Sequence, residues 1–276
     1  DGRVVGGVLR VMNMFVYAAA IGCAACFGLV VAPPFMRRIG RNLLVATAAP
    51  GLKSSGPRFG RVDPASFTDR DLDRARSLTA PGVSRASKRA FDILAALALI
   101  IVFSWLLALT AIAVRLDSKG PSLYRQRRVG KDGREFDIYK FRSMRIDAEK
   151  NGAQWASTDD DRITRVGRFI RRTRIDEIPQ AFNILKGEMS FVGPRPERPE
   201  FVKMLEHEIP HYHDRHLVKP GITGWAQVRH SYTASVEGAR DKLCFDLFYV
   251  KHFSLLLDLL IVLMTVRVAV LGIGSR

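Results

Sequence analysis

Three long apolar stretches constrain the fold of this sequence more than any other feature. They cover residues 11–36, 93–114 and 253–271, and only the third contains charged residues, Asp258 and Arg267. An uncharged helix of about 20 residues is long enough to cross the hydrocarbon core of a bilayer. We therefore expect a membrane-associated protein.

The first stretch is expected to be a transmembrane helix. The basic run that contains Arg37, Arg38 and Arg41 follows it and favours a cytoplasmic C-terminal side, although Arg3 and Arg10 precede it. The segment rich in Pro, Gly and Ser that follows is expected to be a linker with a short helix over residues 71–77. This divides the chain into an N-terminal transmembrane segment with its basic flank (residues 1–48), a linker (49–85) and one further domain (86–276).

The second stretch has basic residues on both sides, among them Lys88, Arg89, Arg115 and Lys119. Two cytoplasmic ends favour a re-entrant helix over residues 88–116, and an ordinary spanning helix is the alternative. Ser104, followed by Trp105, lies at the middle and its hydroxyl would satisfy a backbone group freed by a bend. No Pro or Gly marks that bend.

The third stretch is expected to lie in the membrane interface over residues 253–272, or to pack on the core, because its two charges are costly at mid-bilayer. The fold class is thus mainly α with a small β-hairpin. A re-entrant helix hairpin and interfacial helices would surround a compact, polar cytoplasmic core, residues 117–252. Residues 123–144 contain two strand-like segments on either side of Gly130-Lys131-Asp132-Gly133, and this pattern predicts the hairpin with its turn there.

The formal net charge of +16 requires an anionic partner: nucleic acid, an anionic lipid membrane or a phosphorylated substrate. The three apolar stretches argue against nucleic acid. The basic helix RVGRFIRR, capped by Thr164, favours contact with phosphates, and a solvated face is the alternative.

Two adjacent carboxylates, Asp176 and Glu177, lie in the basic sequence RTRIDEIPQ. Pro179 and Gly187 suit the start and end of a helix over residues 178–186, which places the pair at its N-terminus. Adjacent residues do not share a face, so one carboxylate could attack phosphorus while the other holds a cation. The alternative is that Asp176 caps the helix and Glu177 pairs with an arginine.

Two further motifs contain candidate ligands. Arg195 stands between two prolines, which limit its conformations and suit phosphate contact, although an incidental arginine in a Pro-rich loop is the alternative. The second motif contains His211, His213 and His216. We interpret their spacings as placing them on no common helical or strand face, so we expect them to bond to solvent or backbone rather than to zinc.

Several segments, in colinear order over residues 86–274, together resemble one family: KRAFDILAAL, YRQRRVG, KFRSM, RITRVGRFIRRTRIDEIPQAFNILKGEMSFVGPRPERPEF, KPGITGWAQV and FDLFYVKHFSLLLDL. They resemble the bacterial sugar transferases, which are monotopic phosphoglycosyl transferases. PRPERPEF and LLLDLLIVLMTV are most similar to the exopolysaccharide branch, which includes undecaprenyl-phosphate glucose phosphotransferases.

The resemblance implies transfer of a sugar 1-phosphate from a UDP-sugar to polyprenol phosphate at the cytoplasmic face of the bacterial inner membrane, with Mg2+ and release of UMP. UDP-glucose is the expected donor, with galactose or an N-acetylated sugar left open. A non-catalytic scaffold of a polysaccharide assembly complex is the alternative. Homo-oligomers and polysaccharide assembly partners are also left open.

The resemblance also assigns roles to individual residues. Asp176 would be the nucleophile that forms a covalent phosphosugar intermediate, and Glu177 would hold magnesium. The other matched positions are basic residues expected to bind phosphates and two residues near the active site: Lys140, Arg171, Arg195, Asp246 and Tyr249.

The sequence departs from the family in two places. Family members commonly bend the membrane hairpin at Ser-Pro, where this chain has Ser104 and Trp105. Long relatives have several N-terminal membrane helices and a nucleotide-fold-like domain, whereas residues 1–87 contain one apolar stretch and a linker. We therefore expect a reduced or truncated N-terminal part.

Overall fold

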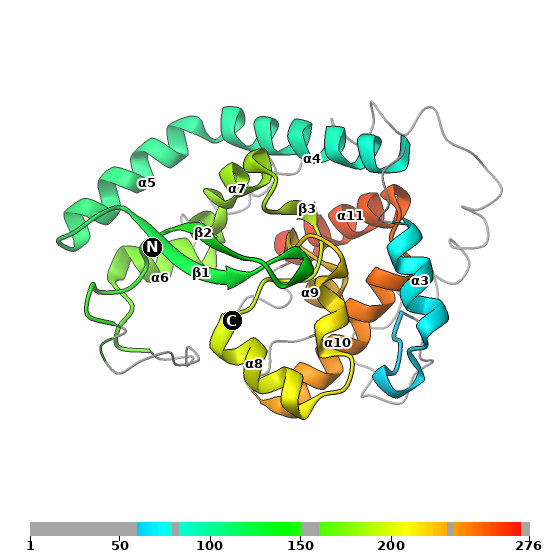
Figure 1. Cartoon of the computed structure of the whole chain (residues 1–276). Coiled ribbons are helices and arrows are strands. Elements are labelled where there is room, and N and C mark those ends of the chain that lie inside the picture. Colours follow the sequence, from blue (N-terminus) through cyan, green and yellow to red (C-terminus); the bar gives the residue numbers. More distant parts are fainter. Residues whose placement is uncertain (1–59, 79–82, 149, 151–159, 231–234, 272–276) are drawn as a thin grey trace.

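The computed structural model describes residues 60–78, 83–148, 150, 160–230 and 235–271 (Figure 1). The transmembrane helix predicted over residues 11–36 lies outside them, as do residues 49–59 and 79–82 of the predicted linker. The described elements are η1 (Pro64–Ser66), α3 (Asp69–Leu78), α4 (Val83–Val102), α5 (Ser104–Asp117), β1 (Leu123–Val129), η2 (Lys131–Gly133), β2 (Glu135–Phe141), α6 (Arg165–Arg172), η3 (Ile175–Glu177), α7 (Gln180–Lys186), β3 (Ser190–Val192), α8 (Pro199–Glu208), η4 (Tyr212–Leu217), β4 (Gly221–Thr223), α9 (Trp225–Arg229), α10 (Val236–Lys251) and α11 (Leu255–Leu271).

The second apolar stretch forms a bent pair of helices, α4 and α5, that lies along one side of the molecule (Figure 1). The axes differ by 63°, and the break is at the buried residue Phe103. Ser104 Oγ donates a hydrogen bond to the carbonyl of Ile101 at 2.9 Å, which satisfies a backbone acceptor beside the break. The chain therefore bends here without proline.

The outer surface of α4 and α5 is apolar. Among the described residues no single helix has the length and hydropathy to cross a membrane, but this bent pair has them jointly. Large apolar side chains recur at helical spacing and are at least 38% exposed: Leu94, Leu97, Ile101, Val102, Trp105, Leu109, Ile112 and Leu116. The pair thus presents a continuous apolar face to its surroundings.

The predicted hairpin is confirmed. β1 and β2 pair antiparallel, with Leu123 opposite Phe141 and Val129 opposite Glu135. A second sheet, the parallel pair β3 and β4, was not predicted, because three-residue strands are too short to show alternation. It needs glycine where the two backbones meet, since a Cβ on Gly193 or Gly221 would lie about 2 Å from the other's segment.

Helix α10 lies at the centre of the core, and its residues Leu243, Leu247 and Val250 are fully buried or nearly so. α11 packs on α4, α9 and both strands of the parallel sheet. Its Asp258 is buried and accepts contacts from Lys88 at 2.8 Å and from the Tyr249 hydroxyl at 2.7 Å. The third apolar stretch therefore packs on the core, and the buried charge that interrupts it is paired.

Candidate active site

The two adjacent carboxylates lie in the short turn η3, between α6 and α7. Thr164 caps α6 as predicted, since its Oγ1 accepts from the Gly167 amide at 2.9 Å. Arg174 has a left-handed backbone, with φ 59°, and turns the chain into η3. α7 begins after Pro179 and ends at Gly187, close to the predicted bounds. Local sequence signals thus place Asp176 and Glu177 directly before α7.

Glu177 is held by two cations from distant segments. Its Oε1 lies 3.0 Å from Lys140 Nζ on β2 and 2.6 Å from Arg195 Nη2, and its Oε2 lies 3.3 Å from Arg195 Nη1. Burial alone would favour the neutral acid, but the charges of Arg195 and Lys140 hold the pKa of Glu177 well below its usual range. Glu177 is therefore a buried, ionised carboxylate.

Asp176 is also buried, but its environment is different. The carboxylate oxygen Oδ1 is buried without a hydrogen-bond partner. Burial, and then the negative charge of Glu177, raise the pKa of Asp176 to about 6, although Lys140, Arg174 and Arg171 favour its ionised form. Buried carboxylates normally have partners, and an exception of this kind often marks a functional group.

A buried ion pair holds the PRP loop (residues 194–196) in place. Arg215 Nη2 donates to the carbonyl of Arg195 at 2.9 Å and lies 2.7 Å from Asp246 Oδ2. The side chains of Arg215 and Asp246 are each 2% exposed. Asp246, which the family resemblance places near the active site, therefore contacts the Arg195 loop through Arg215.

Sequence reasoning missed Arg215 and Glu197 as supports of this loop. Glu197 binds Lys242 at 2.5 Å and Arg128 at 3.7 Å, and these cations hold the pKa of the buried Glu197 carboxyl at about 2 against the effect of burial. Glu197 lies inside the quoted motif PRPERPEF, which was the available signal. Arg215 had no signal of its own, because its partners come from distant segments.

The remaining predicted site residues are Tyr249 and Arg171, and their described hydrogen bonds and ion pairs do not include Asp176 or Glu177. The Tyr249 hydroxyl lies 3.0 Å from the Val192 carbonyl and 2.7 Å from Asp258 Oδ1, so its described contacts join α10 to β3 and α11. Arg171, on the last turn of α6, acts on Asp176 through its charge. The structure thus brings Asp176, Glu177, Lys140 and Arg195 together directly.

The interpretation that the three histidines share no common face was wrong for two of them. His213 and His216 lie in the 3-10 helix η4, where residues three apart share a face. His216 is buried, and burial followed by the charge of Arg215 lowers its pKa to about 3. Glu206 of α8 lies beside them. His211 faces elsewhere and pairs with Asp214 at 2.8 Å.

The acidic pair has the donor chemistry for a magnesium ion. Mg2+ is bound through oxygen, often by one or two carboxylates together with substrate phosphates and water. Asp176 offers an unpartnered oxygen, and Glu177 Oε2 has one long contact, at 3.3 Å. Of the two, Glu177 is the residue whose ionised state is secured by its neighbours.

Comparison with known proteins places the site in a family. The model of the bacterial sugar transferases matches residues 83–272, which include every residue of the site. The chain is 53% identical over 189 residues, 68% of its length, to UDP-N-acetylgalactosamine-undecaprenyl-phosphate N-acetylgalactosaminephosphotransferase of Aeromonas hydrophila. It is 45% identical over 65% of its length to undecaprenyl-phosphate glucose phosphotransferase of Komagataeibacter xylinus.

A third relative is UDP-glucose:undecaprenyl-phosphate glucose-1-phosphate transferase of Xanthomonas campestris pv. campestris, 46% identical over 80% of the chain. The matches span 45%, 35% and 45% of these three proteins, so the chain covers less than half the length of each. The family match covers most of the chain in one continuous segment. This protein therefore belongs to the bacterial sugar transferase family.

Proposed function

We propose that this chain transfers a sugar 1-phosphate from a UDP-sugar to undecaprenyl phosphate or a similar polyprenol phosphate and releases UMP. The carrying observation is the contrast between two adjacent buried carboxylates. Glu177 is ionised and paired with Lys140 and Arg195, whereas Asp176 keeps an unpartnered oxygen. The names of the relatives, which specify glucose and N-acetylgalactosamine phosphotransfer to undecaprenyl phosphate, support the reaction class.

In the first half-reaction the Asp176 carboxylate attacks the β-phosphorus of the UDP-sugar. A bond forms between the carboxylate oxygen and phosphorus, and the bond from that phosphorus to the bridging oxygen breaks. UMP leaves with the bonding electrons, and the sugar phosphate remains on Asp176 as an acyl phosphate diester. An unpartnered carboxylate oxygen suits this role because no hydrogen bond to it must first be broken.

The neighbouring cations would stabilise the transferring phosphoryl group. Arg195 and Lys140 converge on Glu177 from two segments and lie where they could also meet diphosphate oxygens. Magnesium held by Glu177 would neutralise part of the charge on the leaving UMP. Arg171 and Arg174 add positive charge near Asp176, which favours its ionised, attacking form.

In the second half-reaction a phosphate oxygen of the polyprenol phosphate attacks the same phosphorus. The bond to Asp176 breaks and the carboxylate is regenerated, which leaves a polyprenyl diphosphate sugar. A single nucleophile thus serves a soluble donor and a lipid acceptor in turn, and the two need not be bound together.

The lipid substrate requires a site at a membrane, and the α4–α5 face would provide the contact. Its exposed apolar side chains recur along both helices, from Leu94 to Leu116. We propose that this pair enters the cytoplasmic leaflet of the bacterial inner membrane and returns. Single cysteines at Ala86 and Lys119, in a variant without native cysteines, should be labelled from the same side. Labelling from opposite sides would exclude the re-entrant arrangement.

The donor sugar is tested by UMP release. Full-length protein in detergent with Mg2+ and undecaprenyl phosphate is incubated with UDP-glucose, UDP-galactose or UDP-N-acetylgalactosamine in turn. UDP-glucose is the predicted donor, although the relative with 53% identity is named for N-acetylgalactosamine. Asp176→Asn serves as the control and should abolish release. No release from any of a full panel of UDP-sugars would contradict the transferase and favour the scaffold alternative.

A further inference from the structure

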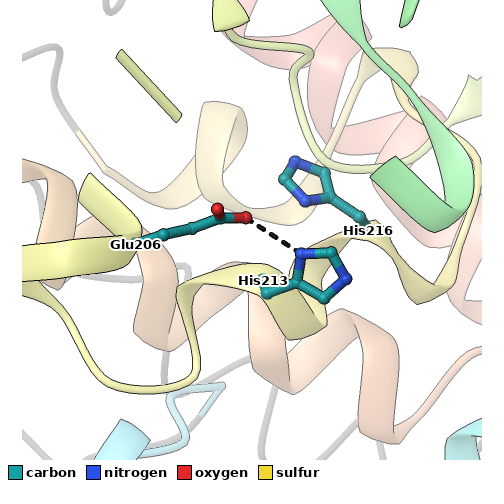
Figure 2. Close-up of side chains that lie close together, drawn as sticks. All are labelled: Glu206, His213 and His216. Carbon is teal, nitrogen blue, oxygen red and sulfur yellow. Dashed lines mark hydrogen bonds and ion pairs between the residues drawn. The ribbon is translucent and has the colours of Figure 1, made fainter. Parts of the chain in front are cut away.

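A cluster of potential metal ligands lies at the corner between α8 and η4. It consists of Glu206, near the end of α8, and of His213 and His216 on one face of η4. One ligand atom of each residue lies within 4.8 Å of those of the other two. Figure 2 shows the three side chains converging, with a ring nitrogen of His216 facing the Glu206–His213 contact.

The contacts within the cluster leave one buried nitrogen unsatisfied. His213 Nδ1 and Glu206 Oε1 are 2.9 Å apart. The rings of His213 and His216 meet edge to face, with centroids 5.6 Å apart. His216 is only 6% exposed, and its Nδ1 is buried without a hydrogen-bond partner. Since burying a ring nitrogen without a partner is costly, the arrangement favours a ligand that would engage it.

We propose that Glu206, His213 and His216 bind one divalent transition-metal ion of the zinc class. Two imidazoles and a carboxylate are a donor set that suits Zn2+ and Co2+, with the fourth position left to water. In a tetrahedral zinc site neighbouring ligand atoms lie about 3.3 Å apart, so ligand atoms that already lie within 4.8 Å of one another need only small side-chain movements to bind an ion. The side chains of His213 and Glu206 are 63% and 34% exposed, which leaves them room to move.

The ion would have a structural role that does not depend on the transferase reaction. It would join α8 to η4, the short helix that also carries Arg215. This site differs from the acidic pair in its chemistry, because imidazole nitrogen favours zinc-class ions whereas Mg2+ favours oxygen.

The test is a titration of the full-length protein, purified without a histidine tag and stripped with a chelator. Co2+ is added in the presence of excess Mg2+, and the visible absorption of tetrahedral Co2+ reports binding. We expect one equivalent to bind and to be displaced by Zn2+. Either ion should also raise the melting temperature of the protein.

Variants of the two more exposed ligands make the test specific. His213→Ala and Glu206→Gln should each weaken Co2+ binding by more than about tenfold and abolish the rise in melting temperature. His207→Ala and Glu208→Gln, at exposed positions beside Glu206 on α8, should behave as the unmodified chain. An unmodified chain that binds no Co2+, or ligand variants that bind it as tightly as the controls, would overturn the proposal.

Discussion

Arg195 donates hydrogen bonds to both carboxylate oxygens of Glu177, with Nη2 2.6 Å from Oε1 and Nη1 3.3 Å from Oε2. This two-pronged contact joins the PRP loop to the turn that carries Asp176. It holds Glu177 ionised, and the resulting negative charge contributes to the raised pKa of Asp176. The two carboxylates are therefore differentiated by their partners, although they are adjacent in sequence.

Arg195→Lys should lower kcat/KM for UMP release by about 100-fold, because a lysine cannot make the paired contact or present a planar fork to phosphate. Arg134→Lys, at an exposed position of the hairpin, is a matched control and should retain activity. Release kinetics over a range of UDP-sugar concentrations measure the effect. An Arg195→Lys variant as active as the control would exclude the proposed role of the guanidinium.

The pH dependence of the reaction should report the ionisation of Asp176. Attack on phosphorus requires the carboxylate, and the pKa of Asp176 in the free protein is raised to about 6. Below that pH, kcat/KM should fall about tenfold for each pH unit as the protonated form accumulates. Initial rates between pH 5 and 8 measure the profile. A profile that stays flat down to pH 5 would contradict the assignment.

Asp176→Asn should stabilise the folded protein while it abolishes activity. Because the fold raises the pKa of Asp176 from 3.8 to about 6, the folded state binds this proton more tightly than the unfolded state does. The wild-type chain therefore loses stability as pH rises through this window, by up to about 3 kcal/mol. Thermal unfolding at pH 8 should show a more stable variant, and the difference should shrink towards pH 4. Equal stability at pH 8 would contradict the buried, raised carboxyl.

The buried pair of Arg215 and Asp246 should matter for both stability and catalysis. Asp246→Asn leaves Arg215 without its charge partner, which should cost about 3 kcal/mol of unfolding free energy. The double variant Arg215→Met, Asp246→Leu should recover much of this stability because neither charge is then left buried alone. It should not recover activity, since the Arg195 carbonyl has lost its donor. A fully active double variant would show that Arg215 does not position the loop.

The parts of the site that could be predicted from sequence are those specified by local signals. The Thr164 cap, the Gly187 stop and the glycine-rich hairpin turn each depend on neighbouring residues, and each forms as expected. The bend in the second apolar stretch was also anticipated, from the basic residues on both of its sides, and Ser104 bonds to a backbone carbonyl there as expected; the break itself is at Phe103.

The remainder depends on contacts between distant segments. Arg215 reaches Asp246 and the carbonyl of Arg195, which are 31 and 20 residues away in the chain. The meeting of Glu206, His213 and His216 was not predicted, because it depends on the 3-10 helix η4 and on the neighbouring α8. No periodic pattern in a single sequence predicts these contacts between distant residues.

The central claim, that Asp176 is the covalent nucleophile, is tested most directly by trapping the intermediate. Full-length protein is mixed with Mg2+ and its UDP-sugar donor without polyprenol phosphate, and is then examined by rapid-quench intact mass spectrometry and peptide mapping. We predict a sugar phosphate on Asp176, formed together with one equivalent of UMP and lost when polyprenol phosphate is added. Full turnover by Asp176→Asn, or an adduct on another residue, would contradict the account.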